Sequence, residues 1–293
     1  MEQGTVILVI LLIVIFAFAA LSFPGLAGNN SPSATPPNPK AEFGVIHEQK
    51  SFFGSTPPTP SPTNETPPPT PQSNLELQKK YISLSKRNTD QRDISQEYVQ
   101  ISYSSSANES LALTDWAISN SRGESFKLGN TTQLPGSGPV GNQDRLIVPK
   151  GSSVYIITGQ SPRGESFRAN KCVDYLNQFK KFTPSLPGSC PSPKNEQGQE
   201  TLNDACYLYV QRLSSCQMPS TPYPLNLDNT CIEYVLKIAS YDACVRLHKN
   251  DPDFYKNEYW TYLNRPNEIW SQVRDSIILR NSRGEVVTTI SYQ

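Results

Sequence analysis

Apolar and polar residues alternate in the stretch 97–150, and this pattern predicts the first strands of a small antiparallel β-sandwich. Val99, Ile101 and Tyr103 are separated by single polar residues, which is typical of a strand with one buried face. We expect the rest of the chain's folded part to be organised around this stretch.

The apolar positions change parity between Leu113 and Trp116. Leu111 and Leu113 follow one alternation, whereas Trp116 and Ile118 follow the other. A shift of one residue moves side chains to the opposite face of a strand, so we expect a bulge or a sharp bend at Thr114–Asp115. We place Trp116 at the centre of the core with Leu113 and Ile118 around it. An exposed indole in a binding site is the alternative, which these apolar neighbours disfavour.

Further apolar runs predict the remaining strands of a folded head that begins near Leu75. They lie at 81–84, 145–148, 152–158, 276–280 and 286–292. The run Val154–Ile157 is apolar at every position, which indicates a strand covered on both faces.

The tripeptide Arg-Gly-Glu occurs three times, each time after Ser or Pro and beside a predicted strand. The copies begin at Arg122, Arg163 and Arg283. A glycine at a position that needs positive φ accounts for this pattern as turn chemistry. An integrin-like recognition tripeptide is the alternative, but turns alone explain the spacing.

An uncharged apolar run from Thr5 to Phe23 predicts a membrane anchor over residues 1–23. Its 19 residues at about 1.5 Å each span roughly 29 Å, which is close to the hydrocarbon thickness of a bilayer. A cleaved signal peptide ending after Ala20 or Ala27 is the alternative. Such peptides have shorter apolar regions and a basic start, whereas Met1–Gly4 contains no basic residue.

The stretch 24–74 predicts a disordered linker. Residues 24–71 contain 13 of the 26 prolines, mixed with Ser, Thr and Asn. Such a composition cannot bury enough apolar surface to fold and favours extended polyproline conformations. We interpret the linker as a spacer between the anchor and the head.

All six cysteines lie within a predicted insertion at 169–264. An even number of cysteines in one segment of an exported chain indicates a disulfide framework. A metal site is disfavoured because there is no Cys-x-x-Cys pair and His248 is the only nearby histidine. Reduced, buried cysteines are a further alternative.

Helical spacing of apolar residues predicts that the insertion is helical. One helix covers 202–213, and a second runs from Cys231 to Val245 with a capping box at Thr230 and Glu233. Asp251–Pro252 would end that helix and begin another. A helical hairpin suits the pairs Cys172–Cys190, Cys206–Cys244 and Cys216–Cys231, which is one of about fifteen possible connectivities.

Few residues carry recognisable chemistry. The 26 basic and 26 acidic residues balance and are scattered, which argues against nucleic-acid binding. We find no nucleophile elbow or phosphate loop, and the chain has only two histidines, His47 and His248. We therefore expect no catalytic residues, no metal, no cofactor and no enzyme activity.

Two clusters in the insertion have alternative interpretations. Asp251, Asp253 and Glu258 would suit a cation, but Asp-Pro-Asp before a helix is more simply capping. The aromatic cluster is expected to pack the insertion onto the sandwich, with sugar or peptide stacking as the alternative. Its members are Tyr255, Tyr259, Trp260 and Tyr262.

Four motifs in this order resemble the lamin tail domain. They are EYVQI at 97–101, LTDWAI at 113–118, LIVPKGSSVYII at 146–157 and DSIILRNSRGEVV at 275–287. The resemblance implies a mainly β, immunoglobulin-like β-sandwich over 75–168 and 265–293, interrupted by the helical, disulfide-bonded insertion. Bacterial relatives of this domain look like interaction or scaffold modules of exported and membrane-anchored proteins, without catalytic residues to carry over. The chain lacks a coiled-coil rod, so lamin-like filaments are not implied.

These features together predict a single-pass membrane protein with a cytoplasmic N-terminus and an extracytoplasmic head. We expect a structural or interaction protein whose partner is a protein or another component of the cell envelope. An adhesin-type head that binds a ligand through the helical insertion is the main alternative, and an enzyme with an unrecognised site is another. The oligomeric state stays open.

Overall fold

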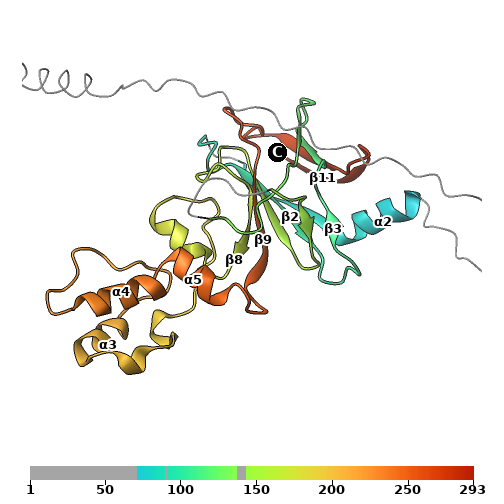
Figure 1. Ribbon diagram of the computed structural model, residues 1–293. Coiled ribbons are helices and arrows are strands. Elements are labelled where there is room, and N and C mark those ends of the chain that lie inside the picture. The colour runs from blue at the N-terminus through green and yellow to red at the C-terminus, as the bar shows by residue number, and fades with distance from the viewer. Residues whose placement is uncertain (1–70, 90–91, 137–142) are drawn as a thin grey trace, which may run out of the picture. The chain divides into compact units, whose positions relative to one another are not determined.

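The computed structural model describes residues 71–89, 92–136 and 143–293, which combine several β-sheets with a helical region (Figure 1). The predicted anchor at 1–23 and the linker up to residue 70 lie outside the described residues. Among the residues that are described, no helix is long and apolar enough to cross a membrane.

Two larger sheets and one short strand pair make up the β structure (Figure 1). The five-stranded sheet has the order β1 (Ile82–Asn88), β2 (Tyr98–Tyr103), β7 (Ser153–Ile157), β9 (Tyr255–Tyr262) and β8 (Phe167–Asn170). The four-stranded sheet has the order β11 (Val286–Tyr292), β10 (Asp275–Arg280), β4 (Ala117–Ser119) and β5 (Ser125–Lys127). The short pair is β3 (Leu111–Ala112) with β6 (Ile147–Val148). Named strands pair antiparallel except β7 and β9, which run parallel.

One buried cluster contains side chains from both larger sheets. Ile101 and Val154 come from the five-stranded sheet, and Ile118 and Leu279 come from the four-stranded sheet. All four are fully buried. Burying an aliphatic side chain of this size contributes about 1.5–3 kcal/mol, so the two sheets stabilise each other through this shared core.

A sharp turn separates β3 from β4, at the position where the apolar pattern shifts. Asp115 has a left-handed backbone with φ of 68°, and the Trp116 amide donates to the Leu113 carbonyl at 3.1 Å. The turn brings Leu113, Trp116 and Ile118 into the same core, where Trp116 is only 2% exposed. The predicted bend and the buried indole are therefore confirmed.

Strand β7 is covered on both faces, as the unbroken apolar run predicts. Val154 and Ile156 point into the core shared by the two sheets. Ile157 belongs to a second cluster, against which Tyr155 packs. The second cluster joins the five-stranded sheet to the helical region, because it also contains Phe167 of β8 and Cys244.

The three Arg-Gly-Glu segments are turns, in agreement with the interpretation of the repeat. Gly123, Gly164 and Gly284 have φ of 85°, 81° and 83°. Two of the turns connect neighbouring strands, β4 to β5 and β10 to β11. In these two, the preceding Asn120 or Asn281 accepts from the amide of the turn's glutamate through its side chain.

The structure corrects the predicted secondary structure at four points. The predicted helix from Cys231 to Val245 is two helices, α4 (Asn229–Ile238) and α5 (Tyr241–His248), because Ala239 leaves the helical conformation. Ser240 then caps α5 by accepting from the Ala243 amide at 3.1 Å. The cap of α4 is Asp228 and not Thr230. The other two corrections concern a missed helix, α2 (Pro71–Tyr81), and a missed strand, β9, where a third helix was expected.

Strand β9 lies inside the stretch 169–264 that was interpreted as an insertion. It pairs with both β7 and β8, so this stretch supplies one strand to the five-stranded sheet. The helical part is confined to the chain between β8 and β9. The predicted domain boundaries at 168/169 and 264/265 stay predictions.

Candidate functional site: the disulfide-bonded helical region

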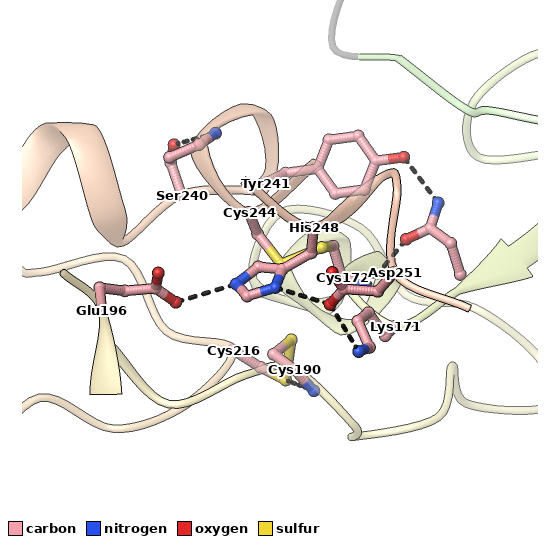
Figure 2. Close-up of a disulfide and its surroundings, with 12 residues drawn as sticks. Lys171, Cys172, Cys190, Glu196, Cys216, Ser240, Tyr241, Cys244, His248 and Asp251 are labelled. Carbon is pink, nitrogen blue, oxygen red and sulfur yellow. Dashed lines mark hydrogen bonds and ion pairs between the residues drawn. A yellow bond between two sulfur atoms is a disulfide. The ribbon is translucent and has the colours of Figure 1, made fainter. Parts of the chain in front are cut away.

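All six cysteines form disulfides within residues 172–244, which we call the helical region. Cys172 pairs with Cys244, Cys190 with Cys216, and Cys206 with Cys231. Figure 2 shows the first two of these bonds in one neighbourhood. The disulfide framework is therefore present, but each of the three pairs predicted from a helical hairpin is wrong.

The pairing differs because α3 and α4, the first two α-helices of the helical region, meet at their N-termini. Helix α3 (Asp204–Val210) begins after Asn203, and α4 begins after Asp228. The two cap side chains are hydrogen-bonded to each other at 2.9 Å. Each cap also accepts from the amide of the cysteine three residues later. This arrangement brings Cys206 and Cys231 together, whereas a hairpin would place the end of one helix beside the start of the next.

Two separate apolar clusters stabilise the helical region. The Cys206–Cys231 disulfide packs with Val210, Val235 and Ile238 of α3 and α4. The Cys172–Cys244 disulfide belongs instead to the cluster that includes β8 and β9. Helix α5 is thus anchored to the sheet, while α3 and α4 form a small unit of their own. In this unit, the Cys206–Cys231 disulfide supplements a limited apolar core.

A charged network surrounds His248 at the end of α5 (Figure 2). Its Nε2 lies 2.9 Å from Glu196 Oε1, and its Nδ1 lies 2.9 Å from Asp251 Oδ2. Lys171 Nζ contacts the same Asp251 oxygen at 3.0 Å and Asp253 Oδ1 at 2.5 Å. The network joins the end of β8, the turn at Glu196 and the segment after α5.

The charges of this network stabilise one another. Burial lowers the pKa of His248, but hydrogen bonds from its ring to Glu196 and Asp251 outweigh that effect and raise the pKa above the ordinary value. The Lys171 ammonium and His248 lower the pKa of Asp251. Opposite charges within hydrogen-bond distance favour the ionised form of each partner, so each charge of the network extends the pH range over which its partner stays ionised.

A groove lies beside the start of α5, between this helix and η1 (Val173–Gln178). It has a volume of 340 Å³. Its lining combines the apolar side chains Leu176, Phe179 and Met218 with charged groups such as Arg163. Phe179 is 65% exposed, so its ring is accessible at the groove.

Arg163 brings a nearly buried positive charge to this groove. Its side chain is 14% exposed, and its Nε lies 3.6 Å from the buried Glu165 carboxylate. That distance is short enough for an ion pair but too long for a good hydrogen bond. Arg163 Nε has no hydrogen-bond partner within the described residues. The groove is therefore lined by apolar side chains and by a nearly buried guanidinium.

The aromatic residues of the predicted cluster lie in strand β9 and do not gather on the surface. Tyr259, Trp260 and Tyr262 are buried at 0%, 1% and 7% exposure, and Trp260 stacks on Phe167 at 5.9 Å between ring centroids. Packing is therefore their role. Tyr255 is 41% exposed, and the Arg168 guanidinium lies 5.0 Å from the centre of its ring.

The acidic residues after α5 do not cap a following helix. The segment leads into strand β9, and Asp251 and Asp253 pair with Lys171. Within the described ranges, no group of three or more His, Cys, Asp or Glu side chains is placed to hold a metal ion.

Sequence reasoning missed the groove and the His248 network. The groove combines segments around 163, 176, 218 and 240, whose proximity depends on the disulfide pairing. The network had one local signal in the sequence. Asp251 follows His248 by three residues, and both lie near the end of a helix. Glu196 is 52 residues away, and no pattern in the sequence links it to the histidine.

No protein-family model matches this chain, and no curated protein sequence is similar to it.

Proposed function

We propose that the chain is an extracytoplasmic interaction protein that binds a partner through its helical region. The observation that carries this proposal is the position of all three disulfides within residues 172–244, the region that also supplies most of the lining of the groove at Phe179. The disulfides hold the surface of the helical region in one conformation, although this region has only a small apolar core. A pre-formed surface loses less conformational entropy on binding.

The β part of the molecule serves as the scaffold of this surface. Its two sheets share a core centred on Trp116, which supports an immunoglobulin-like, lamin-tail-like sandwich. In the bacterial relatives of that domain, the fold looks like an interaction or scaffold module. By this analogy, the sandwich presents the helical region and carries no catalytic residue.

Disulfide-rich proteins persist in oxidising compartments, which supports an extracytoplasmic head. The proposed topology has an extracytoplasmic head, with residues 1–23 as a single membrane anchor and a cytoplasmic N-terminus. Residues 24–74 are the proposed spacer. These parts of the proposal rest on the sequence, because the anchor and all but the end of the spacer lie outside the described residues.

The groove favours a protein partner from the cell envelope. Leu176, Phe179 and Met218 suit an apolar side chain, and Met adapts to irregular shapes. Arg163 and Asp242 at the groove suit polar groups that flank such a side chain. Interfaces commonly combine an apolar anchor in a pocket with a polar rim.

The test is a pull-down from detergent-solubilised membranes with the full chain as bait. Phe179→Asp places a charge in the groove and is expected to abolish capture of the partner. Val273→Asp is the matched control, because Val273 is 76% exposed and lies outside the helical region. The proposal predicts that wild type and Val273→Asp capture the same protein and that Phe179→Asp does not. Equal capture by all three, or loss only in the control, would contradict it.

A further inference from the structure

The two ring nitrogens of His248 both face carboxylate oxygens. Nε2 lies 2.9 Å from Glu196 Oε1, and Nδ1 lies 2.9 Å from Asp251 Oδ2. A neutral imidazole has one donor and one acceptor nitrogen, whereas an ionised carboxylate only accepts. Both contacts are hydrogen bonds only when the ring carries two protons, so this geometry belongs to the imidazolium form.

We propose that His248 is a pH-sensitive clasp that holds the segment 193–199 against α5 when protonated and releases it when neutral. The clasp has three parts, which are His248, Glu196 and Asp251. It is independent of what the helical region binds, because it follows from hydrogen-bond chemistry at one side chain.

The charges around the clasp decide which contact is lost. Asp251 keeps the Lys171 ammonium at 3.0 Å, and Lys171 is also held by Asp253. Because Lys171 holds Asp251 in place, a neutral His248 that keeps its remaining proton on Nδ1 preserves its hydrogen bond to Asp251. Nε2 would then turn a lone pair toward Glu196, and the two would repel each other. Glu196 is therefore the partner that is released.

Two tyrosines are further titratable groups near Glu196. The charge of Glu196 contributes to the raised pKa values of Tyr175 in η1 and of Tyr234 in α4, although burial is the main cause for both. The pKa of Tyr175 is raised to about 12. Tyrosines with raised pKa values stay neutral below the ordinary value near about 10, so neither tyrosine changes its charge near neutral pH.

The clasp links the two apolar clusters of the helical region. Gln197, next to Glu196, accepts from the hydroxyl of Tyr234 in α4 at 2.9 Å. His248 holds the same segment to α5, and α5 is cross-linked to Cys172. Release of Glu196 would loosen the α3–α4 unit from α5 while the three disulfides keep the chain connected.

The direction of the pH effect follows from the raised pKa of His248. A group whose pKa is higher in the folded protein stabilises that state fully below its unfolded value, 6.5 for histidine. This contribution is lost as the pH rises through the higher, folded value. The clasp is therefore closed below about pH 6.5 and opens as the pH rises through the higher, folded-state pKa of His248.

Two measurements on the full chain in detergent micelles test the clasp. Nuclear magnetic resonance of ¹⁵N-histidine reports His47 and His248, with His248→Gln assigning the signals. We expect His248 to show two protonated ring nitrogens at about pH 6 and to titrate above the ordinary histidine value near about 6.5. Titration of His248 at or below that value would overturn the proposal.

Hydrogen exchange of residues 193–199 provides the second readout, at about pH 6 and about pH 8.5, with rates corrected for intrinsic exchange. Loss of one charge-assisted bond predicts about tenfold weaker protection at the higher pH. Glu196→Gln should remove this difference, whereas Glu200→Gln, a neighbouring carboxylate, should keep it. Equal protection of wild type at both pH values, or an unchanged difference in Glu196→Gln, would overturn the proposal.

Discussion

Cys172 and Cys244 are 72 residues apart and are joined by a disulfide that connects the end of β8 to α5. The loop that this bond closes contains the other two disulfides and both helices of the α3–α4 unit. The helical region is thus one covalent loop, inserted between two strands that pair with each other, β8 and β9.

Removing this bond is expected to destabilise the protein more than removing Cys206–Cys231. The loops span 72 and 25 residues, for which the loop-entropy relation gives roughly 4.4 and roughly 3.5 kcal/mol. The double variants Cys172→Ser/Cys244→Ser and Cys206→Ser/Cys231→Ser should therefore differ by about 1 kcal/mol in the free energy of unfolding in urea. The opposite order would contradict the account.

Trp116→Ala is expected to lower the free energy of unfolding by about 3–5 kcal/mol, the usual cost of truncating a large buried aromatic side chain. The indole is 2% exposed and packs in the core shared by the two larger sheets. Val273→Ala is the control and should change stability by less than about 0.5 kcal/mol, because Val273 is 76% exposed. A Trp116→Ala variant that unfolds at the wild-type urea concentration would show that the indole is not in the core.

Gly284→Ala tests the turn between β10 and β11. Gly284 has φ of +83°, and an added Cβ would meet nothing within 4 Å, so the cost is backbone strain alone. We expect a loss of about 1 kcal/mol in stability. Gly129→Ala is the matched control for Gly284→Ala, because an added Cβ at Gly129 also meets nothing within 4 Å while the φ of Gly129 lies outside the left-handed range. It should be close to neutral, and equal effects of the two substitutions would argue against the left-handed turn.

Asp275 makes stability depend on pH at the acid end. Burial raises its pKa, but hydrogen bonds from the amides of Ser121, Ser271 and Ser276 outweigh this and lower the pKa below the ordinary value of 3.8. A lowered pKa stabilises the fold above the unfolded value and loses that contribution as pH falls through the folded value. The urea concentration at the midpoint of unfolding should thus decrease as the pH falls below about 5. Asp275→Asn should flatten this dependence, and an unchanged slope would show that another group causes it.

Local patterns predict the strands of the shared core well. The alternation at Val99 and Ile101 marks β2, and the parity change before Trp116 marks the turn at Asp115. These features are set by near neighbours in the sequence and by which face of a strand is buried. They could be read before any long-range contact was known.

Longer-range features could not be predicted in the same way. Tyr255, Tyr259 and Tyr262 recur at intervals of four and three residues, which mimics a helix, yet β9 is a strand whose last four residues are all buried. Packing on both faces removes the alternation that identifies a strand. Cysteine pairing, the groove and the contact of Glu196 with His248 depend on where distant segments meet, and one sequence carries no signal for that.

The central claim is that the helical region is held by three disulfides formed outside the cytoplasm. Peptide mapping of the exported protein without reduction, with thiol labelling before and after reduction, tests it most directly. The account predicts the pairs Cys172–Cys244, Cys190–Cys216 and Cys206–Cys231 and no labelled thiol before reduction. Labelling of all six cysteines in the native, unreduced protein would contradict both the cross-linked helical region and the extracytoplasmic head.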